Sequence, residues 1–249
     1  MSITSFSLEG QVAIVTGGGT GIGRGIALEF AKAGADVVVC SRTLANLEKV
    51  AEEVRVLGKR SLAVRTDVTQ KADVDNMVQR AMDEFGAIDI LVNCSGIFLT
   101  ASFLELREDD WDRLINTDLK GCWRCCQAVG KKMVERKRGN IINIGGTTTM
   151  FTVYSVAKWG VIMLTRGLAK ELASYNIRVN AIDPGWVRTK MPELLLRSDP
   201  EALKKFLTGV PLGRIAEPSE IGNVALFLAS EASSYITGTT IVIDGGCQA

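Results

Sequence analysis

The stretch QVAIVTGGGTGIGRGIALEFAKAG, residues 11–34, decides the fold of this chain. It begins with an apolar, β-branched run at 11–16 and passes through a glycine-rich turn at 17–23. Beyond the turn, Ile26 and Phe30 recur at the spacing of one helix face. Glycines allow a close backbone approach, and the amides of a helix N-terminus bind phosphate groups. The stretch therefore predicts a strand–turn–helix unit that binds a dinucleotide pyrophosphate, and the alternative is that the glycines serve only the turn.

Short apolar runs alternate with amphipathic segments along the rest of the chain. Such runs are typical of strands that are buried on both faces of a parallel sheet, and the segments between them have helical periodicity. Repeated βαβ units imply right-handed crossovers with helices on both faces of the sheet. We therefore expect an α/β fold, in which residues 1–249 form a single Rossmann-type domain with a doubly wound parallel sheet of about seven strands. The expected strands are 11–16, 36–41, 61–66, 88–93, 139–144, 177–182 and 240–243.

The composition excludes several classes of function. The chain has 249 residues, of which 47% are hydrophobic and 23% are charged, and its formal net charge is +1. A net charge this close to zero argues against a nucleic acid or an anionic membrane as a partner. The sequence contains no histidine, so Ser-His-Asp triads, Cys-His pairs and histidine metal sites are excluded. Acid–base chemistry near neutral pH then falls to a tuned Tyr, Lys, Cys, Asp or Glu.

The six cysteines do not have the pattern of a disulfide framework, and we expect no metal site. Cys122, Cys125 and Cys126 share one helical face, and we interpret them as small packing residues. The alternative is a metal or redox site. Residues 1–10 lack the features of a signal peptide, and no apolar run approaches the roughly 18 residues that span a bilayer. We therefore expect a cytoplasmic protein without a membrane partner.

The end of the second expected strand bears on the choice of dinucleotide. An acidic residue about 20 residues beyond the glycines binds the ribose diol of NAD, whereas an arginine accommodates a 2′-phosphate. Here Ser41 stands where that acid would be, and Arg42 follows it. A serine hydroxyl can donate a hydrogen bond to phosphate, and a guanidinium can pair with it. These residues favour NADP(H), with NAD(H) as the alternative if Arg42 is an ordinary surface cation.

The sequence resembles the classical branch of the short-chain dehydrogenase/reductase family along essentially its whole length. The markers are TGGGTGIG (16–23), DV (67–68), NCSG (93–96), YSVAK (154–158), PGWVRT (184–189), YITG (235–238) and DGG (244–246). The resemblance implies hydride transfer between an alcohol or ketone and a nicotinamide dinucleotide. It also implies that Asp67 and Val68 contact the adenine ring. Asn93 and Gly96 would lie along the middle of the cofactor.

The resemblance assigns the nicotinamide end of the cofactor as well. Val187 and Thr189 would hold the carboxamide, and Lys158 would bind the hydroxyls of the nicotinamide ribose. We expect no metal ion at this site. The residues expected to bind the dinucleotide are Gly17, Gly19, Thr20, Gly21, Ile22, Gly23, Ser41, Arg42, Asp67, Val68, Asn93, Gly96, Tyr154, Lys158, Pro184, Gly185, Val187 and Thr189.

Tyr154 and Lys158 are the expected acid–base pair. They are four residues apart on an expected helix at 154–174, so their side chains share one face. The ordinary tyrosine pKa of about 10 makes a poor base at neutral pH, but an ammonium group beside the ring stabilises the phenolate. Tyr154 can then protonate an alkoxide during reduction, or take the proton during oxidation, while the nicotinamide carries the hydride. The alternative is that both are ordinary helix residues.

Two positions depart from the family pattern. Asp118 stands where the family has an asparagine whose backbone carbonyl holds a water in a proton relay. An aspartate can supply the same carbonyl, and its charge can pair with Lys158. The family's serine, about a dozen residues before the tyrosine, is absent: Gly146 takes its place at the end of the strand, and only seven residues separate it from Tyr154. A threonine hydroxyl can polarise the carbonyl instead, with Thr147 as the first choice.

Segment 190–212 stands where the family carries a mobile lid, and its leucines indicate an apolar cover that favours an apolar ketone over a free sugar. The alternative is that they are packing residues. By resemblance we expect a homotetramer, with helices 111–136 and 154–174 in one interface and strand 240–243 in the other. The resulting hypothesis is an NADP(H)-dependent oxidoreductase that interconverts a secondary alcohol and a ketone. One alternative is an NAD(H)-dependent sugar or polyol dehydrogenase. Another, motivated by Asp118 and the missing serine, is a dinucleotide-binding sensor or subunit with little catalysis.

Overall fold

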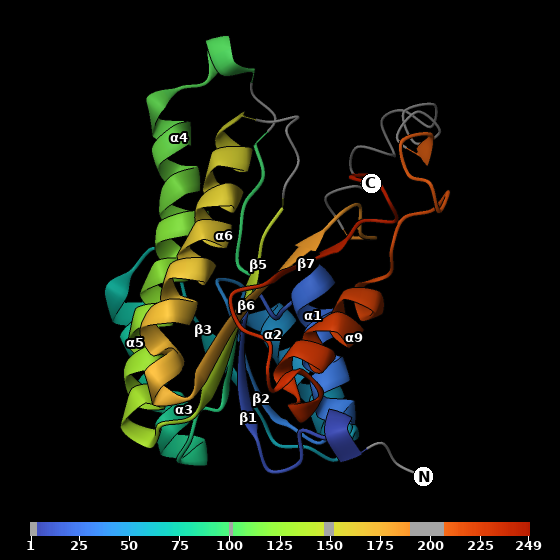
Figure 1. The fold of residues 1–249 in the computed structure, drawn as a ribbon. Coiled ribbons are helices and arrows are strands. Elements are labelled where there is room, and N and C mark those ends of the chain that lie inside the picture. The colour runs from blue at the N-terminus through green and yellow to red at the C-terminus, as the bar shows by residue number, and fades with distance from the viewer. Residues whose placement is uncertain (1–3, 100–101, 147–151, 190–206) are drawn as a thin grey trace.

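A seven-stranded parallel sheet runs through the centre of the protein (Figure 1). The computed structural model describes residues 4–99, 102–146, 152–189 and 207–249. The strand order is β3-β2-β1-β4-β5-β6-β7, and every neighbouring pair is parallel. No strand end lies more than two residues from its expected position, so the expected fold class is confirmed. The strands are β1 (Val12–Thr16), β2 (Asp36–Ser41), β3 (Ser61–Arg65), β4 (Ile90–Asn93), β5 (Gly139–Ile144), β6 (Ile177–Pro184) and β7 (Thr240–Ile243).

Helices cover both faces of the sheet, as the apolar strands require (Figure 1). Alternate strand residues face opposite sides: Val15 packs in the core beneath one set of helices, and Ile14 packs in the core beneath the other. The first set is α1 (Gly21–Lys32), α2 (Leu44–Val56) and α9 (Pro218–Ala229). The second set is α3 (Lys71–Phe85), α5 (Gly121–Arg136) and α6 (Thr152–Leu172).

The expected helix at 111–136 begins earlier and contains an irregular turn. Helix α4 (Glu108–Leu114) continues through a π-helical turn at Ile115–Lys120 directly into α5. A π-turn widens the helix by one residue and is frequent at functional sites. Asp118 lies in this turn and is buried. Among the described residues, the remaining elements are short 3₁₀ turns at Thr4–Phe6, Phe103–Glu105, Ala173–Tyr175 and Glu231–Ser233.

The strand order reverses direction at β1, which has β2 on one side and β4 on the other. In an open parallel sheet such a reversal leaves a crevice beyond the carboxyl ends of the strands, because the adjoining crossovers run to opposite faces. The register aligns Thr16 with Cys40 on β2 and with Asn93 on β4, so the three loops that follow these strands begin side by side. The fold therefore brings the glycine-rich turn together with the segments at 41–42 and 94–96.

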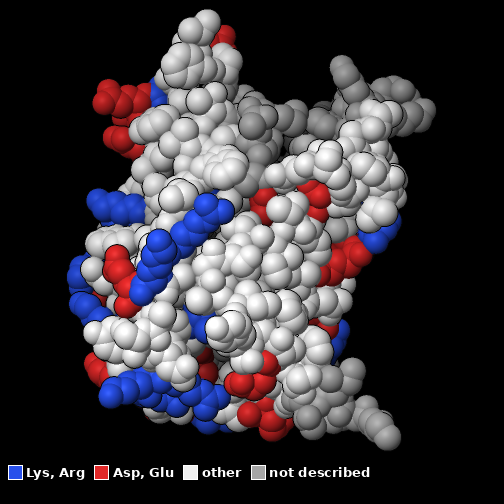
Figure 2. All heavy atoms as spheres, viewed as in Figure 1, with Lys and Arg blue, Asp and Glu red and all other residues white. Residues whose placement is uncertain are grey.

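The cysteines of α5 contribute to the apolar core as free thiols. Cys122, Cys125 and Cys126 are buried against α3 and the sheet, and all six cysteines are free thiols. Within the described residues, no group of three potential ligands could hold a metal ion. None of the described helices is long and apolar enough to cross a membrane. On the face in Figure 2, basic and acidic side chains are interspersed around an uncharged area.

Candidate active site

A cleft of about 380 Å³ lies at the carboxyl ends of the first four strands. Its size, and its mostly apolar lining with some polar groups, are those of a small-molecule site. Twelve of the residues expected to bind a dinucleotide line it, and the loops that follow β1, β2, β3 and β4 all contribute. Those twelve are Gly17, Gly19, Thr20, Gly21, Ile22, Gly23, Ser41, Arg42, Asp67, Val68, Gly96 and Thr189. Sequence reasoning missed six lining residues, which lie beside expected residues in the same loops, in the first turn of α2 or in the π-turn: Thr43, Asn46, Thr66, Cys94, Ser95 and Thr117.

The glycine-rich turn has the shape of a phosphate cradle. Gly17 has a φ of +67°, and a Cβ there would lie 2.7 Å from the carbonyl oxygen of Cys94, so no other residue fits without displacing the neighbouring loop. A Cβ on Gly21 would lie 2.9 Å from Cγ2 of Thr189, which brings the loop after β6 against the same turn. Thr20 makes no side-chain capping hydrogen bond to α1, so the first amides of this helix are left for a ligand. These features fit the pyrophosphate of a dinucleotide.

Arg42 places a positive charge at the adenosine end of the cleft. Ser41 is close to the glycine turn, because a Cβ on Gly19 would lie 3.4 Å from its hydroxyl oxygen. Arg42 is exposed and lines the cleft, and it forms no ion pair with any residue that the structure describes. The register of β2 and β3 pairs Arg65 with Ser41 on the neighbouring strand, so a second arginine begins close to this position. A 2′-phosphate would meet donors of the right charge here.

Asp67 and Val68 are held firmly at the end of β3. Asp67 accepts hydrogen bonds on Oδ1 from the amide and the hydroxyl of Thr69, at 2.9 and 2.8 Å. Its own amide donates to Asp73 at 2.9 Å. The Val68 side chain is buried against the start of α5, where a Cβ on Gly121 would lie 2.7 Å from Cγ2 of Val68. Both residues line the cleft.

The structure directs the Asn93 side chain away from the cleft. Its amide donates to Oδ1 of Asn143 at 2.8 Å and contacts the Cys126 sulfur at 3.2 Å, beneath α5. The next loop is instead positioned by Thr16, whose hydroxyl oxygen accepts hydrogen bonds from the Cys94 and Ser95 amides at 3.0 and 3.1 Å. The Asn93 side chain therefore holds the end of β4 on the side of the sheet covered by α5, and residues 94–96 line the cleft.

The expected acid–base pair and Asp118 come together. The Lys158 ammonium nitrogen lies 5.5 Å from the centre of the Tyr154 ring and 3.2 Å from Oδ2 of Asp118. The other carboxylate oxygen of Asp118 accepts a hydrogen bond from the Ile97 amide at 2.8 Å. The ammonium group also donates to the carbonyl of Ile144, at 3.3 Å. Lysine and aspartate form a buried ion pair with additional hydrogen bonds, which such a pair needs to offset the loss of solvent.

The charges of this group set the protonation state of the tyrosine. Burial raises the pKa of Tyr154 above its usual value, the Lys158 ammonium opposes this effect, and Asp118 adds to it. Burial alone would lower the pKa of Lys158, but Asp118 and Tyr154 reverse this and hold it above its usual range. Burial also raises the pKa of Asp118, and Lys158 opposes that change. In the protein alone, Tyr154 is therefore protonated at neutral pH and is ready to donate a proton.

Gly146 lies directly against the tyrosine hydroxyl. A Cβ at Gly146 would lie 3.0 Å from Oη of Tyr154 and 3.3 Å from Cγ of Lys158. The space that a side chain would need at this position is thus already occupied by the acid–base pair. On another side, the ring of Phe98 meets the Tyr154 ring edge-on at 5.1 Å. Thr147, the expected hydroxyl donor, lies outside the described residues.

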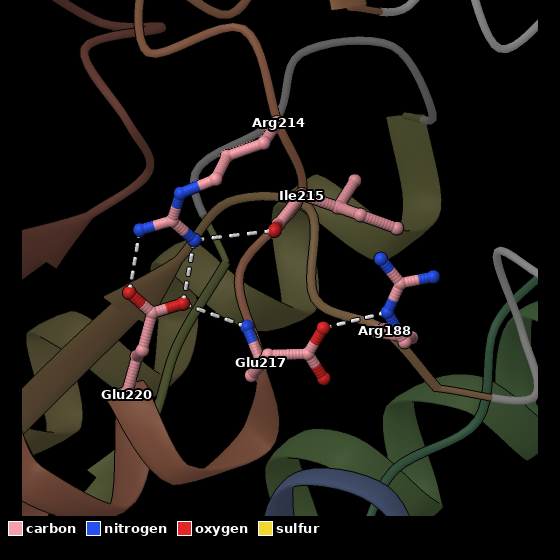
Figure 3. Close-up of polar contacts among 5 residues, drawn as sticks. All are labelled: Arg188, Arg214, Ile215, Glu217 and Glu220. Carbon is pink, nitrogen blue, oxygen red and sulfur yellow. Dashed lines mark hydrogen bonds and ion pairs between the residues drawn. The ribbon is translucent and has the colours of Figure 1, made fainter.

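The loop after β6 is fixed by its contacts with the segment before α9. Val187 is buried and pairs with Ala216 in an isolated bridge, and Arg188 donates through its Nε to Glu217 at 2.6 Å (Figure 3). Glu220 holds the other side of this turn, accepting hydrogen bonds from Arg214 and from the Glu217 amide. The contacts hold Thr189 at the cleft. Tyr154, Lys158, Pro184, Gly185 and Val187 are likewise not among the described residues that line the cleft. Residues 190–206 of the expected lid lie outside the description.

Three comparisons with known proteins bear on this site. A family model described as enoyl-(acyl carrier protein) reductase matches residues 17–248. The chain is 42% identical over 250 residues to the oxidoreductase UcpA of Salmonella typhimurium, covering 96% of this chain and 95% of that protein. It is 39% identical to the 3-oxoacyl-(acyl-carrier-protein) reductase FabG of Thermotoga maritima, covering 96% and 98%. The crystal structure of a short-chain type dehydrogenase/reductase from Mycobacterium marinum matches with a TM-score of 0.92 at 36% identity, covering 99% and 98%.

The chain is a short-chain dehydrogenase/reductase. The resemblance drawn from the motifs is confirmed. As a short-chain dehydrogenase/reductase it is an oxidoreductase that acts on alcohols and carbonyl compounds with NAD(P)(H), and its substrate is a small molecule. The glycine cradle and the uncapped helix N-terminus fit that cofactor, and the Tyr154–Lys158 pair fits that chemistry.

Proposed function

We propose that this protein is an NADP(H)-dependent oxidoreductase that interconverts a secondary alcohol and a ketone, with Tyr154 as the general acid and base. The single observation that carries the proposal is the group formed by Tyr154, Lys158 and Asp118, directly behind the cleft wall at Gly96. In a chain without histidine, these three side chains are acid–base groups that the structure brings together beside Gly96, which lines the cleft. The bound dinucleotide supplies the hydride.

Each residue of the group has a separate task. Tyr154 donates its proton to the carbonyl oxygen as negative charge develops there, and takes it back when an alcohol is oxidised. Lys158 stabilises the phenolate that is left, because its ammonium faces the ring and is sheltered from water. Lys158 is also the residue proposed to bind the nicotinamide ribose. Asp118 holds Lys158 in place. For the missing serine we propose that Thr147 supplies the hydroxyl donor.

The preference for NADP(H) rests on charge at the adenosine end. Ser41 stands where an acid would bind the ribose diol of NAD, Arg42 lines the cleft beside it, and Arg65 pairs with it on the neighbouring strand. An arginine pairs well with a phosphate dianion. NAD(H) with a sugar or polyol is the competing assignment, since Asp67 places a carboxylate in the same part of the cleft.

A second candidate function is a dinucleotide-binding sensor with little catalysis. Two observations favour it: Asp118 partly cancels the charge that activates Tyr154, and Gly146 offers no hydroxyl beside Oη. Against it stands the close approach of Lys158 to the tyrosine ring. A sensor would keep the cleft but would not need this contact.

We also propose that the protein acts as a homotetramer. Apolar side chains are exposed on the two helices that the resemblance assigns to one interface, and an exposed valine lies on the edge strand β7 that it assigns to the other. A second copy of the chain would remove these side chains from water. They are Trp123 on α5, Val156, Trp159 and Met163 on α6, and Val242 on β7. Light scattering on the purified protein measures the assembly.

Steady-state kinetics with both dinucleotides test the proposed function. We expect NADPH oxidation with a panel of apolar ketones, a higher kcat/KM with NADPH than with NADH, and loss of that preference in Arg42→Ala. Tyr154→Phe should keep dinucleotide binding and lose turnover. Tight NADPH binding by the unchanged protein with no turnover on any ketone or alcohol would instead favour the sensor. A preference for NADH would support the NAD(H) assignment.

A further inference from the structure

Asp118 introduces a negative charge directly behind the wall of the cleft. A Cβ on Gly96 would lie 2.7 Å from Oδ2 of Asp118 and 3.4 Å from the Lys158 nitrogen, and Gly96 itself lines the cleft. Gly96 follows β4, whereas Arg42 follows β2, and the two strands lie on opposite sides of β1. The ion pair is therefore at the end of the cleft away from Arg42, where the nicotinamide belongs in the proposed function.

Burial raises the pKa of Asp118, and the groups that face its carboxylate oppose this change and favour the ionised form. Both carboxylate oxygens face donors: Oδ1 the Ile97 amide at 2.8 Å, and Oδ2 the Lys158 ammonium at 3.2 Å. The side chain is completely buried, so solvent does not screen its charge. The pair is neutral as a whole. With the asparagine that the family carries at this position, the same wall would hold one uncompensated positive charge.

A charge at this place acts differently on the two forms of the cofactor. The oxidised nicotinamide ring is a cation and the reduced ring is neutral, so a lone ammonium nearby weakens binding of the oxidised form alone. We propose that Asp118, by neutralising Lys158, selectively strengthens binding of the oxidised dinucleotide and so sets the balance between the two forms on the protein. This inference rests on the proposed function. By linkage, the same factor moves the hydride-transfer equilibrium on the protein toward the oxidised dinucleotide and the alcohol.

The direct test measures binding without turnover. Isothermal titration gives the Kd of NADP⁺, of NADPH and of 2′-phospho-ADP-ribose, which lacks the nicotinamide, for the unchanged protein and for Asp118→Asn. We expect the ratio of Kd for NADP⁺ to Kd for NADPH to rise about tenfold in Asp118→Asn, as a unit charge in a partly screened site predicts. The affinity for 2′-phospho-ADP-ribose should stay within about twofold, because that ligand lacks the nicotinamide ring on which the carboxylate is proposed to act.

A matched control is available at the opposite end of the sheet. Asp89 is also buried, pairs with Arg136 at 3.1 Å and accepts a hydrogen bond from the Val12 amide at 2.9 Å, but it lies before the amino end of β4. Asp89→Asn removes a buried, paired carboxylate of the same kind and should leave the ratio unchanged. Melting curves verify that each variant is folded, and Asp118→Ser takes over the test if Asp118→Asn is not.

Three outcomes overturn the inference. An unchanged ratio in Asp118→Asn means that the carboxylate does not act on the nicotinamide charge. An equal loss of affinity for all three ligands means that Asp118 has a structural role. If the unchanged protein binds neither NADP(H) nor NAD(H), the proposed function is refuted, and the inference that rests on it is refuted as well. If NAD(H) is the cofactor, the same titration with NAD⁺, NADH and ADP-ribose applies, and the expected change in the ratio is the same.

Discussion

Replacing Lys158 by methionine removes the cation that faces Tyr154, and the structure gives the size of the effect. The ammonium nitrogen lies 5.5 Å from the ring centre in a site sheltered from water. A unit charge at that distance, with an effective dielectric constant of about 20, stabilises a phenolate by about 3 kcal/mol. Losing it raises the pKa of Tyr154 and lowers the phenolate fraction at a fixed pH by roughly a hundredfold. Alcohol oxidation should slow by a similar factor.

Two measurements report this change separately. The first is the pH dependence of kcat/KM for alcohol oxidation, which should move to higher pH in Lys158→Met. The second is an ultraviolet difference titration of tyrosine ionisation, which needs no substrate. The chain has three tyrosines, and Tyr154→Phe identifies which step belongs to Tyr154. Its midpoint should rise in Lys158→Met, in parallel with the kinetic profile.

The variant has a structural side effect that a double variant controls. Lys158→Met leaves Asp118 buried and unpaired, which costs about 3–5 kcal/mol of stability. Lys158→Met/Asp118→Asn removes both charges and should recover much of that stability. Because Asp118 raises the pKa of Tyr154, the titration midpoint of the double variant should lie below that of Lys158→Met. The reasoning is refuted if the Tyr154 midpoint is the same in the unchanged protein, the single variant and the double variant.

Other variants probe the position of the missing serine, the glycine-rich turn at 17–23, and the ion pair between Arg214 and Glu220 at the start of α9. Gly146→Ser should lower kcat/KM at least about tenfold, because a Cβ there would lie 3.0 Å from Oη of Tyr154; an increase would mean that the absent hydroxyl is the real defect. Gly17→Ala should destabilise the fold by about 1–3 kcal/mol and weaken NADPH binding more than tenfold. Gly58→Ala is its control, since Gly58 shares a positive φ (+82°) but has open space around it, and equal affinity losses in both would contradict the cradle. The hydrogen bond with Arg214 is the main reason why the pKa of Glu220 is lowered to about 2. The stability that Glu220 gives the fold is therefore fully present above the ordinary pKa of a glutamate and is lost as the pH falls through about 2. Glu220→Gln should therefore lower the melting temperature slightly at pH 7 and not at pH 2, and a pH-independent difference would argue against this ion pair.

The elements that the sequence predicted well are those whose signal is local. The turn at 17–23 carries its own backbone requirements, and Gly17 shows why: its positive φ and the backbone 2.7 Å from its Cβ position exclude other residues. The apolar strands are equally predictable, because a strand that is buried on both faces is a continuous apolar run without polar alternation.

The orientation of Asn93 could have been predicted and was not. Side chains alternate along a strand, and Leu91 packs in the core beneath α3, α5 and α6. Asn93 is two residues further on β4 and therefore faces the same helices, where it bonds to Asn143. The motif predicts that Asn93 lies along the cofactor, and the strand parity adds that its side chain belongs to a buried network.

Other parts of the site depend on contacts distant in the sequence. Nothing in the local sequence predicts the π-turn at Ile115–Lys120, because its residues are compatible with an ordinary helix. Yet that turn contains Thr117, which lines the cleft, and Asp118, which pairs with Lys158. Likewise, the bond from Arg188 to Glu217 joins residues 29 positions apart, and only the folded chain brings them together.

The most direct test of the central claim is the transfer of isotope from the cofactor to the product. NADPH labelled with deuterium at C4, on each face in turn, is incubated with a reducible ketone and the protein, and the alcohol is analysed by mass spectrometry. We predict deuterium on the carbinol carbon from one labelled face, and none when Tyr154→Phe replaces the unchanged protein. Deuterium transfer by Tyr154→Phe at the unchanged rate, or unlabelled alcohol from both labelled forms, would contradict the account.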